Sequence, residues 1–170
     1  MTGTSIRTAE PAEFPAVARL TVAAYEADGQ LKGETGYAEV LADVAGRAAH
    51  GEVLVAVDPA TGQLLGSVTF VLPGSPYAEV SGPGEAEFRM LAVDPAAQGR
   101  RVGAALVQAC VDRATGRGCT ALAICVREGY AESAQRLYRR RGFIRTPELD
   151  WSPLPGVHLL ALRLSLTPPA

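Results

Sequence analysis

The stretch that decides the fold lies past the middle of the chain and reads EFRMLAVDPAAQGRRVGAALV at residues 87–107. It predicts a strand that ends at Asp94-Pro95, a connection with two glycines, and an amphipathic helix that runs to about residue 116. A helix N-terminus presents unpaired N–H groups and the positive end of its dipole, and glycines let a backbone approach an anion closely. The stretch therefore predicts a phosphate or pyrophosphate site.

Two other phosphate-binding motifs are absent from this stretch. A Walker loop would read GxxxxGK[ST], and a dinucleotide fingerprint would read GxGxxG with an acidic residue about twenty positions further on. A second informative stretch, SAQRLYRRRGF, follows at residues 133–143. It predicts a helix over residues 131–141, which Gly142 ends in the left-handed conformation.

The two stretches LAVDPAAQGRRVGAALV (91–107) and SAQRLYRRRGF (133–143) resemble, in order and separation, two signatures of the GNAT-type N-acetyltransferase family. These are the acetyl-CoA motif Q/R-x-x-G-x-G/A and the downstream motif A-x-x-L-Y-x-x-x-G-F. The chain departs from the family at Arg101, where the first motif glycine is usual, and at Ala131, where Asn is frequent. The resemblance implies a single α/β (α+β) domain over residues 1–170. Its mostly antiparallel sheet would have six to seven strands, about four flanking helices, and a splay between strands four and five.

The remaining segments fit that order. Patterns of apolar residues predict strands at residues 5–10, 52–58, 63–72, 120–126 and 157–166, and helices at residues 11–28 and 37–50. Residues 58–62 predict a hairpin turn, residues 29–36 and 73–84 predict loops, and residues 144–151 have mixed character.

Composition excludes several classes of protein. The chain has 170 residues, 48 % of them apolar and 20 % charged, and a net charge of −2, which is typical of one globular domain and gives no general attraction to nucleic acid. The three cysteines show no CxxC spacing, so neither a disulfide framework nor a metal site is predicted. The first residues show no basic segment followed by an apolar one, and no apolar run reaches the roughly 18 residues of a membrane-spanning helix. We expect a cytoplasmic protein without a membrane partner, in which exposed sheet edges would allow a homodimer.

The resemblance also implies a set of cofactor-binding residues. The pantetheine arm of acetyl-CoA would lie between strands four and five and pair with the backbone like an added strand; the alternative is a plain central strand with every ladder bond made. The pyrophosphate would meet backbone N–H groups of the glycine-containing connection, which could instead only cap a helix. Arg100 and Arg101 would add charge-assisted contacts, or be solvated. The residues implied are Leu91, Ala92, Val93, Gln98, Gly99, Arg100, Arg101, Val102, Gly103, Ala104 and Tyr138.

Two side chains are candidates for catalysis. Tyr138 would protonate the leaving thiolate, although Ala134, Leu137 and Tyr138 share a helical face and a core tyrosine is the alternative. Glu87 would deprotonate the acceptor ammonium. Strand alternation predicts that it shares a face with Arg89, Leu91 and Val93, so a surface pair with Arg89 is the alternative.

The acceptor site is expected between the two loops at residues 29–36 and 73–84 and the C-terminal strands. Acidic residues outnumber Lys32 around the first loop and would suit a cationic amine, or merely be solvated; they are Glu26, Asp28, Glu34, Glu39 and Asp43. Aromatic residues that would line a pocket or belong to the core are Tyr25, Tyr37, Tyr77 and Trp151. Cys110 and Cys125 are interpreted as small core residues and not as nucleophiles.

The sequence therefore predicts an acetyl-CoA-dependent N-acetyltransferase that acts on a primary amine of a small molecule or of a peptide or protein. The amine would attack in a ternary complex without a covalent enzyme intermediate. The principal alternative is a non-catalytic acetyl-CoA sensor of the same fold. A transferase for longer acyl groups is also open, and a nucleotide transferase ranks last because no Mg²⁺-binding carboxylate cluster accompanies the loop.

Overall fold

The computed structural model describes residues 3–32 and 36–166. Its α-helices are α1 (Phe14–Ala27), α2 (Tyr37–Ala42), α3 (Val44–His50), α4 (Val102–Gly116) and α5 (Glu132–Arg141). Its strands are β1 (Ser5–Thr8), β2 (Glu52–Val57), β3 (Leu64–Val71), β4 (Ala86–Val93), β5 (Ala121–Arg127), β6 (Ile144–Arg145), β7 (Trp151–Leu154) and β8 (Val157–Ser165). Single 3-10 turns are η1 (Pro11–Glu13), η2 (Pro95–Ala97) and η3 (Pro147–Leu149). None of the helices in these ranges is long and apolar enough to cross a membrane.

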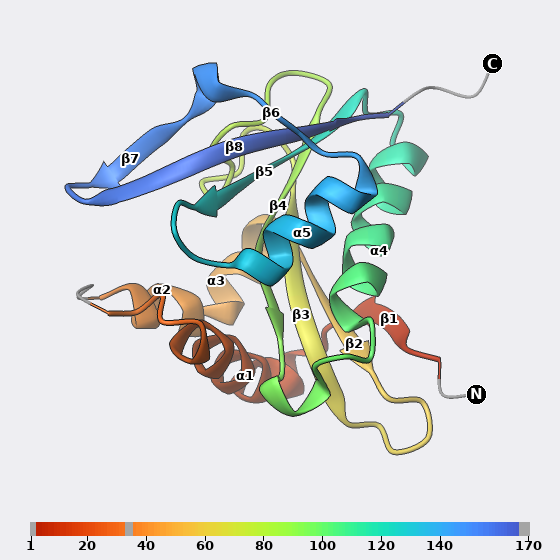
Figure 1. The fold of residues 1–170 in the computed structure, drawn as a ribbon. Helices are drawn as coiled ribbons and strands as arrows, with labels where there is room; N and C mark the ends of the chain where they lie inside the picture. The colour runs from red at the N-terminus through yellow and green to blue at the C-terminus, as the bar shows by residue number, and fades with distance from the viewer. Residues whose placement is uncertain (1–2, 33–35, 167–170) are drawn as a thin grey trace.

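One mixed sheet holds all eight strands in the order β1-β2-β3-β4-β5-β8-β6, with β7 paired to β8 beside this path (Figure 1). The β4–β5 pairing is parallel and the other described pairings are antiparallel. The predicted mostly antiparallel sheet is confirmed, with one strand more than expected. The additional strand arises because residues 144–151 contain both the short β6 and the start of β7.

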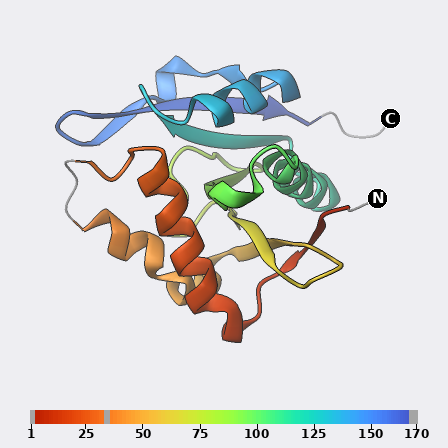
Figure 2. The ribbon, with the colours of Figure 1, turned by 60° about the horizontal axis from the view of Figure 1, so that its bottom comes forward.

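Helices cover both faces of this sheet (Figures 1 and 2). Alternating residues of β2 show the two layers, because Leu54 and Ala56 pack in a core with α4 and α5, whereas Val53, Val55 and Val57 pack with α1 and α3. A strand that is buried on both faces has little need for polar residues, which explains the continuous apolar run of β2.

The predicted helix over residues 37–50 is two helices. Asp43 interrupts it with φ −80° and ψ 68°, and its carboxylate accepts a hydrogen bond from the Gly46 N–H at 3.0 Å. A short polar side chain that binds the backbone in this way competes with the continuing helix and caps the next one. The break accounts for a fifth α-helix where about four were expected.

The predicted splay between the fourth and fifth strands is confirmed. Strands β4 and β5 pair at Ala86–Leu122 and Glu87–Ala123, while β5 continues to pair with β8 as far as Arg127. The edge of β4 that faces β5 is therefore without a strand partner from residue 88 to residue 93, within the described part of the chain. The alternative of a central strand with every ladder bond made is wrong.

A bulge in β4 accompanies the splay. Arg89 pairs with Thr69 of β3 and Ala92 pairs with Ser67, so two residues, Met90 and Leu91, oppose a single residue of β3. Met90 has a φ of +58°, a left-handed value that is uncommon for a side chain of this size.

The bulge overturns the strict alternation expected for this strand. Phe88 belongs to the core beneath α4 and α5, and Leu91 and Val93 pack against that same core. Arg89 and Met90 line a cavity elsewhere in the molecule, together with residues of the α1–α2 region. The prediction that Glu87, Arg89, Leu91 and Val93 share a face is wrong, because one inserted residue moves every later side chain to the opposite face.

Candidate functional site

A groove of about 500 Å³ runs along the open end of β4. Its walls come from the last residues of β4, the connection into α4, the first turn of α4, one side of α5 and the end of α1. Of the predicted cofactor residues, those that line this α4 groove are Leu91, Ala92, Val93, Gln98, Gly99, Arg101, Val102, Gly103 and Ala104. The remaining two, Arg100 and Tyr138, do not line it.

Helix α4 begins at the groove with its N–H groups available. No side chain caps this end, and the first N–H to close the helix is that of Ala105, which donates to the Arg101 carbonyl oxygen. The N–H groups of Val102, Gly103 and Ala104 precede it and belong to the first turn, which has no intrahelical acceptor. An uncapped turn with the positive end of a helix dipole is suited to an anionic group such as a pyrophosphate.

The two departures from the family motifs occupy corresponding backbone positions. Arg101 and Ala131 are the residues that precede α4 and α5, and both are left-handed, with φ of +59° and +56°. Glycine and Asn are the residues that tolerate this conformation best. Arg101 and Ala131 thus adopt a backbone conformation that a glycine or an Asn would hold with less strain.

Residues with a left-handed backbone conformation line the α4 groove and a second cavity next to it. Among the described residues, the non-glycine positions with positive φ are Met90, Arg101 and Ala131. Arg101 and Ala131 line the α4 groove, and Met90 lines the neighbouring cavity. Each such conformation costs on the order of 1–2 kcal/mol and persists where the surrounding structure holds it, which is a common property of binding sites.

Among the groove residues outside the predicted cofactor set, three contribute a charge or a close contact. Asp28, at the end of α1, accepts a hydrogen bond from the Ala131 N–H at 2.9 Å and so ties the first helix to the start of α5. Arg140 adds a cation to the lining, and the Leu137 side chain lies against Gly103. Arg140 could have been suggested from the cluster of arginines in the second motif.

Arg100 points away from the groove. Its guanidinium forms an ion pair with Asp58 at 3.0 Å, in the turn between β2 and β3. The prediction that Arg100 and Arg101 act alike is therefore not supported by their surroundings, because only Arg101 lies on the groove wall.

Tyr138 lies in an aromatic cluster with Phe88 and Phe143, with ring centroids 5.8 and 5.6 Å away. It is 4 % exposed, and this burial raises the pKa of its phenol well above the usual value. A neutral phenol remains a hydrogen-bond donor across the ordinary pH range. Its place in the core is thus shown, and its contact with a leaving thiolate stays a prediction.

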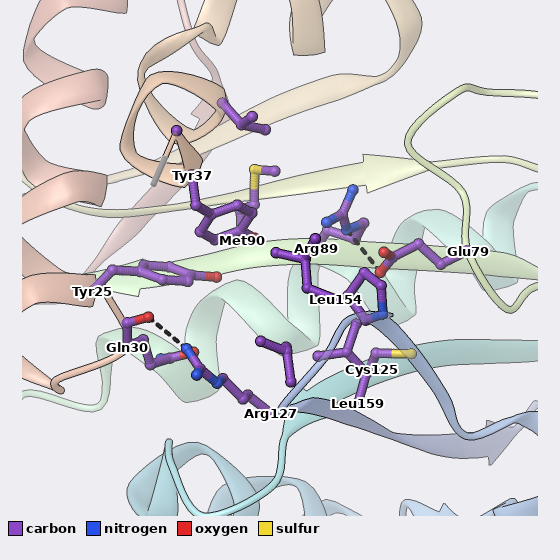
Figure 3. A pocket seen from close by; sticks show the side chains of 14 residues that line it. Tyr25, Gln30, Tyr37, Glu79, Arg89, Met90, Cys125, Arg127, Leu154 and Leu159 are labelled. Carbon is purple, nitrogen blue, oxygen red and sulfur yellow. Dashed lines mark hydrogen bonds and ion pairs between the residues drawn. The ribbon is translucent and has the colours of Figure 1, made fainter. Parts of the chain in front are cut away.

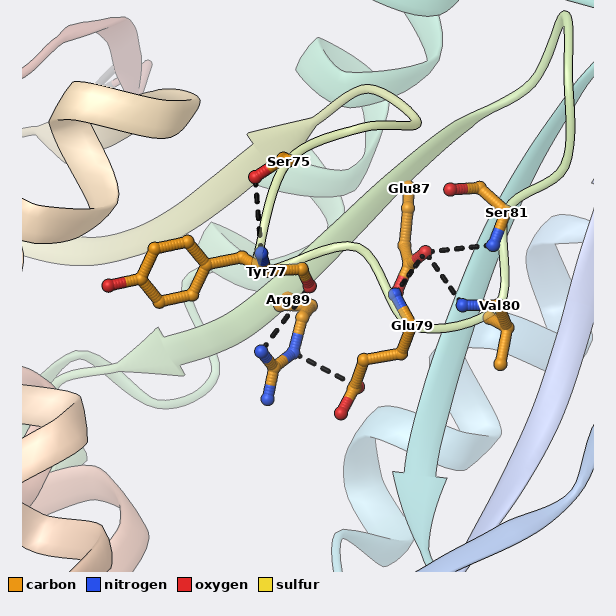
Figure 4. Close-up of polar contacts among 7 residues, drawn as sticks. All are labelled: Ser75, Tyr77, Glu79, Val80, Ser81, Glu87 and Arg89. Carbon is orange, nitrogen blue, oxygen red and sulfur yellow. Dashed lines mark hydrogen bonds and ion pairs between the residues drawn. The ribbon is translucent and has the colours of Figure 1, made fainter.

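Glu87 has a different environment from the one expected. Its side chain is fully buried, and its carboxylate accepts hydrogen bonds from the backbone N–H groups of Glu79, Val80 and Ser81 at 2.9–3.0 Å (Figure 4). The expected surface pair with Arg89 is wrong, because Arg89 instead pairs with Glu79 at 3.1 Å. Glu87 holds the loop between β3 and β4 against the sheet.

A second hollow, the central pocket, has a volume of about 380 Å³ (Figure 3). Its walls include the loop after α1, the loop before β4 and the C-terminal strands, which are the segments expected around an acceptor site. Tyr25 lines both hollows, so they meet at this side chain. The residues that line the pocket are Tyr25, Gln30, Gly36, Tyr37, Val40, Glu79, Arg89, Met90, Cys125, Arg127, Pro153, Leu154, Val157 and Leu159.

The acidic field expected around the first loop does not face this pocket. Among its described members, Glu26, Asp28, Glu39 and Asp43 are all absent from the lining, and Glu34 lies outside the described residues. The carboxylate that does line the pocket is Glu79, whose side chain is 13 % exposed and whose pKa is raised mainly by burial. Sequence reasoning missed it because a glutamate in a loop of residues 73–84 has no distinguishing pattern.

The cysteines differ in location. Cys110 is fully buried in the core as expected, whereas Cys125 is only partly buried and lines the central pocket. Burial raises the pKa of the Cys125 thiol to about 12 and that of the Cys110 thiol further still. Thiols of this kind are protonated near neutral pH and are poor nucleophiles. No group of three or more potential metal ligands occurs in residues 3–32 and 36–166.

Comparison with known proteins points to one family. A model of the acetyltransferase (GNAT) family matches residues 15–143 of the chain. A search of curated proteins found no match. Many solved structures share the fold.

Three solved structures illustrate this similarity. One is the ribosomal-protein-S18-alanine N-acetyltransferase from Escherichia coli, with 17 % identity, a TM-score of 0.70, and coverage of 99 % of this chain and 97 % of the other. A GCN5-related N-acetyltransferase from Kribbella flavida has 28 % identity, a TM-score of 0.68, and coverage of 96 % and 98 %. A GNAT family acetyltransferase from Brucella melitensis in complex with acetyl-CoA has 23 % identity, a TM-score of 0.63, and coverage of 99 % and 91 %.

Proposed function

Because this chain belongs to the acetyltransferase (GNAT) family, we propose that it is an N-acetyltransferase that uses acetyl-CoA. The acceptor is a primary amine of a small molecule or of a peptide or protein, and it attacks directly in a ternary complex. The observation that carries the proposal is the open edge of β4 at residues 88–93, placed beside the uncapped first turn of α4. A cytoplasmic setting and a homodimer stay predictions.

The open edge fits the pantetheine arm. An amide-containing chain laid along β4 would meet main-chain groups that have no strand partner, as in the addition of an extra strand. At the end of that edge, the N–H groups of Val102, Gly103 and Ala104 would hold the pyrophosphate. A similar protein that is described in complex with acetyl-CoA supports the choice of cofactor.

The transfer step needs three kinds of group. A backbone N–H near Leu91 or Ala92 would stabilise the negative charge that develops on the thioester oxygen. Tyr138 would donate a proton to the departing thiolate as the carbon–sulfur bond breaks. A carboxylate would take the proton that the acceptor ammonium must lose before its nitrogen can attack, and Glu87 was the candidate suggested by the resemblance.

Direct attack is supported by the state of the thiols. A covalent intermediate would need a thiolate near the thioester, and Cys125, which lines the central pocket, has a pKa raised to about 12. We therefore expect no acetyl-cysteine after incubation with acetyl-CoA alone. Intact-mass measurement of the protein checks this, and a stable mass gain of one acetyl group on a cysteine would contradict direct attack.

Thermal-shift measurement tests cofactor binding. Acetyl-CoA or CoA at about 100 times its Kd adds roughly 2.7 kcal/mol of stability, which for a domain of this size raises Tm by about 5–10 °C, and NAD should have no such effect. Absence of a shift with both CoA compounds would contradict the proposal. Release of CoA in the presence of a panel of amines then separates an enzyme from a sensor that binds without turnover.

Two glycines of α4 supply a matched pair of variants. A Cβ at Gly103 would lie 3.3 Å from the Leu137 side chain inside the groove, whereas a Cβ at Gly116 would meet nothing within 4 Å. We expect Gly103→Val to abolish the shift with acetyl-CoA and Gly116→Val to retain it. Equal shifts in both variants would place the cofactor elsewhere.

A further inference from the structure

The central pocket differs from the α4 groove in what lines it. Apart from its charged residues, its walls are mostly apolar or aromatic, with Tyr25 and Tyr37 on one side and Leu154 and Leu159 on the other (Figure 3). The ring centroids of Tyr25 and Tyr37 are 6.0 Å apart. Apolar walls of this kind bind an apolar ligand body, because its surface leaves water on binding.

Three charged side chains face this pocket. Glu79 and Arg89 form an ion pair at 3.1 Å, and their side chains are 13 % and 17 % exposed. Arg127 donates a hydrogen bond to the Gln30 carbonyl oxygen at 2.7 Å, and its guanidinium lies over the Tyr130 ring at 4.5 Å from the centroid. Among the described residues that line the pocket, the carboxylate is that of Glu79.

The Glu79 carboxylate is positioned but not saturated. The Arg89 contact is made through Oε1, and among the described residues Oε2 makes no hydrogen bond. A carboxylate oxygen can accept more than one hydrogen bond. The three N–H contacts to Glu87 hold the Glu79 backbone in place, so the free acceptor capacity has a fixed location on the pocket wall.

The two hollows lie on either side of the β4 bulge. Met90 lines the central pocket, and the next three residues, Leu91, Ala92 and Val93, line the α4 groove. The proposed function requires that the groove holds acetyl-CoA. The acceptor would then reach the thioester at the β4 bulge from the central pocket.

We propose that the central pocket is the acceptor site, that Glu79 and not Glu87 binds the acceptor ammonium and takes its proton, and that the acceptor carries a single amine on an apolar body. This inference rests on the proposed function. Glu87 acts as a positioning residue for Glu79, because all of its described hydrogen bonds go to the backbone of residues 79–81.

The protons balance in this assignment. The acceptor ammonium gives one proton to Glu79, directly or through a water molecule, and the neutral nitrogen forms a bond to the thioester carbon. The carbon–sulfur bond breaks and Tyr138 gives its proton to the thiolate. The second proton, which the nitrogen loses on becoming an amide, restores the Tyr138 phenol. Glu79 then releases its proton to solvent, so that one proton is liberated per turnover.

Burial supports Glu79 in this role. Desolvation raises the pKa of its carboxyl group, Glu87 on β4 raises it further, and Arg89 on β4 lowers it, with a net raised value. Cys125 on β5 also faces this region, and its thiol stays protonated because of burial. A carboxylate with a raised pKa is a better proton acceptor near neutral pH.

Binding measurements test the site without requiring turnover. We suggest titration of 2-phenylethylamine and its uncharged analogue 2-phenylethanol into the protein, with and without saturating CoA, by calorimetry. The wild type should bind the amine at least about tenfold more tightly than the alcohol, which corresponds to about 1.4 kcal/mol. Glu79→Gln should lose this preference, and the exposed Glu148→Gln should retain it.

Glu79→Gln leaves the largely buried Arg89 guanidinium without its carboxylate partner, and the fold could be lost for that reason alone. A double variant controls for this. Glu79→Gln with Arg89→Gln removes both charges, and it should bind both probes equally while retaining a cooperative thermal transition. With acetyl-CoA and the amine, CoA release should fall at least about 100-fold in both variants.

Several outcomes would overturn the inference. These are an amine preference that survives in Glu79→Gln, absence of binding of both probes to the wild type, and tighter binding of the polycation spermidine than of 2-phenylethylamine. Failure of the proposed function is seen separately, because CoA and acetyl-CoA would then give no heat of binding in any variant.

Discussion

Glu87→Gln distinguishes the role that the structure gives to Glu87, an anchor for the loop before β4, from the general-base role that the family resemblance implies. Glutamine has nearly the same shape as glutamate, but it carries one acceptor oxygen and one donor nitrogen. The wild-type carboxylate accepts from three backbone N–H groups, and the Glu79 N–H lies 3.0 Å from both of its oxygens. The variant therefore loses the charge of the acceptor and sets an NH₂ group against the Glu79 N–H.

The cost follows from these contacts. Hydrogen bonds to a charged group contribute about 1.5–3 kcal/mol each, and neutral ones about 0.5–1.5, so the difference is roughly 1 kcal/mol for each of three donors. The variant no longer has to bury a charged group, and this gain offsets part of the loss. We expect Glu87→Gln to lower the free energy of unfolding by about 2–3 kcal/mol.

Urea denaturation followed by circular dichroism measures this loss. With a slope of about 2–3 kcal/mol per molar urea, the midpoint should fall by roughly 1 M, while Glu148→Gln, at an exposed position, should stay within about 0.5 kcal/mol of the wild type. A pure general base would behave differently, since its isosteric variant would lose turnover and keep stability. An unchanged midpoint in Glu87→Gln would refute the anchoring role.

Three further substitutions probe the backbone and the surface charge. Arg101→Gly should relieve the left-handed strain at φ +59° and raise stability by about 0.5–1 kcal/mol, while weakening CoA binding through loss of the guanidinium; stronger binding in calorimetry would contradict this. Ala131→Asn should stabilise by a similar amount, because Asn tolerates the φ of +56°, and a lower urea midpoint would show that the strain argument fails. The hydrogen bond from the Arg7 guanidinium lowers the pKa of Glu13 to about 2, from an ordinary value of 4.5. The ion pair therefore stabilises the fold fully above pH 4.5, and this stabilisation is lost as the pH falls through about 2. Glu13→Gln should therefore cost about 1 kcal/mol at pH 7, since the pair is partly exposed, and almost nothing at pH 2, and an equal loss at both pH values would count against the ion pair.

Local patterns in the sequence were sufficient for most of the elements. The strand–loop–helix around residues 91–107 and the helix that ends at Gly142, with a φ of +105°, were predicted from the spacing of apolar residues, glycine and proline. The splay of β4 from β5 was implied by the family resemblance and is present. Asp43 was missed as a helix break, since its effect depends on which backbone N–H its carboxylate reaches.

The sequence by itself determined the fold, the family, and the two helix N-termini that line the α4 groove, because these depend on residues close together in the chain. Only the tertiary structure decided which face of the sheet each β4 side chain occupies and which groups it contacts. The bulge at Met90 depends on register with β3, and the burial of Glu87 and the placement of Glu79 depend on a loop folding back over the sheet. Side-chain periodicity carries no information on either event, since both are set by contacts with residues outside the strand. The stretch at residues 87–107, which predicts the strand, loop and helix of the fold, therefore also contains Glu87, the residue whose role the structure changes most.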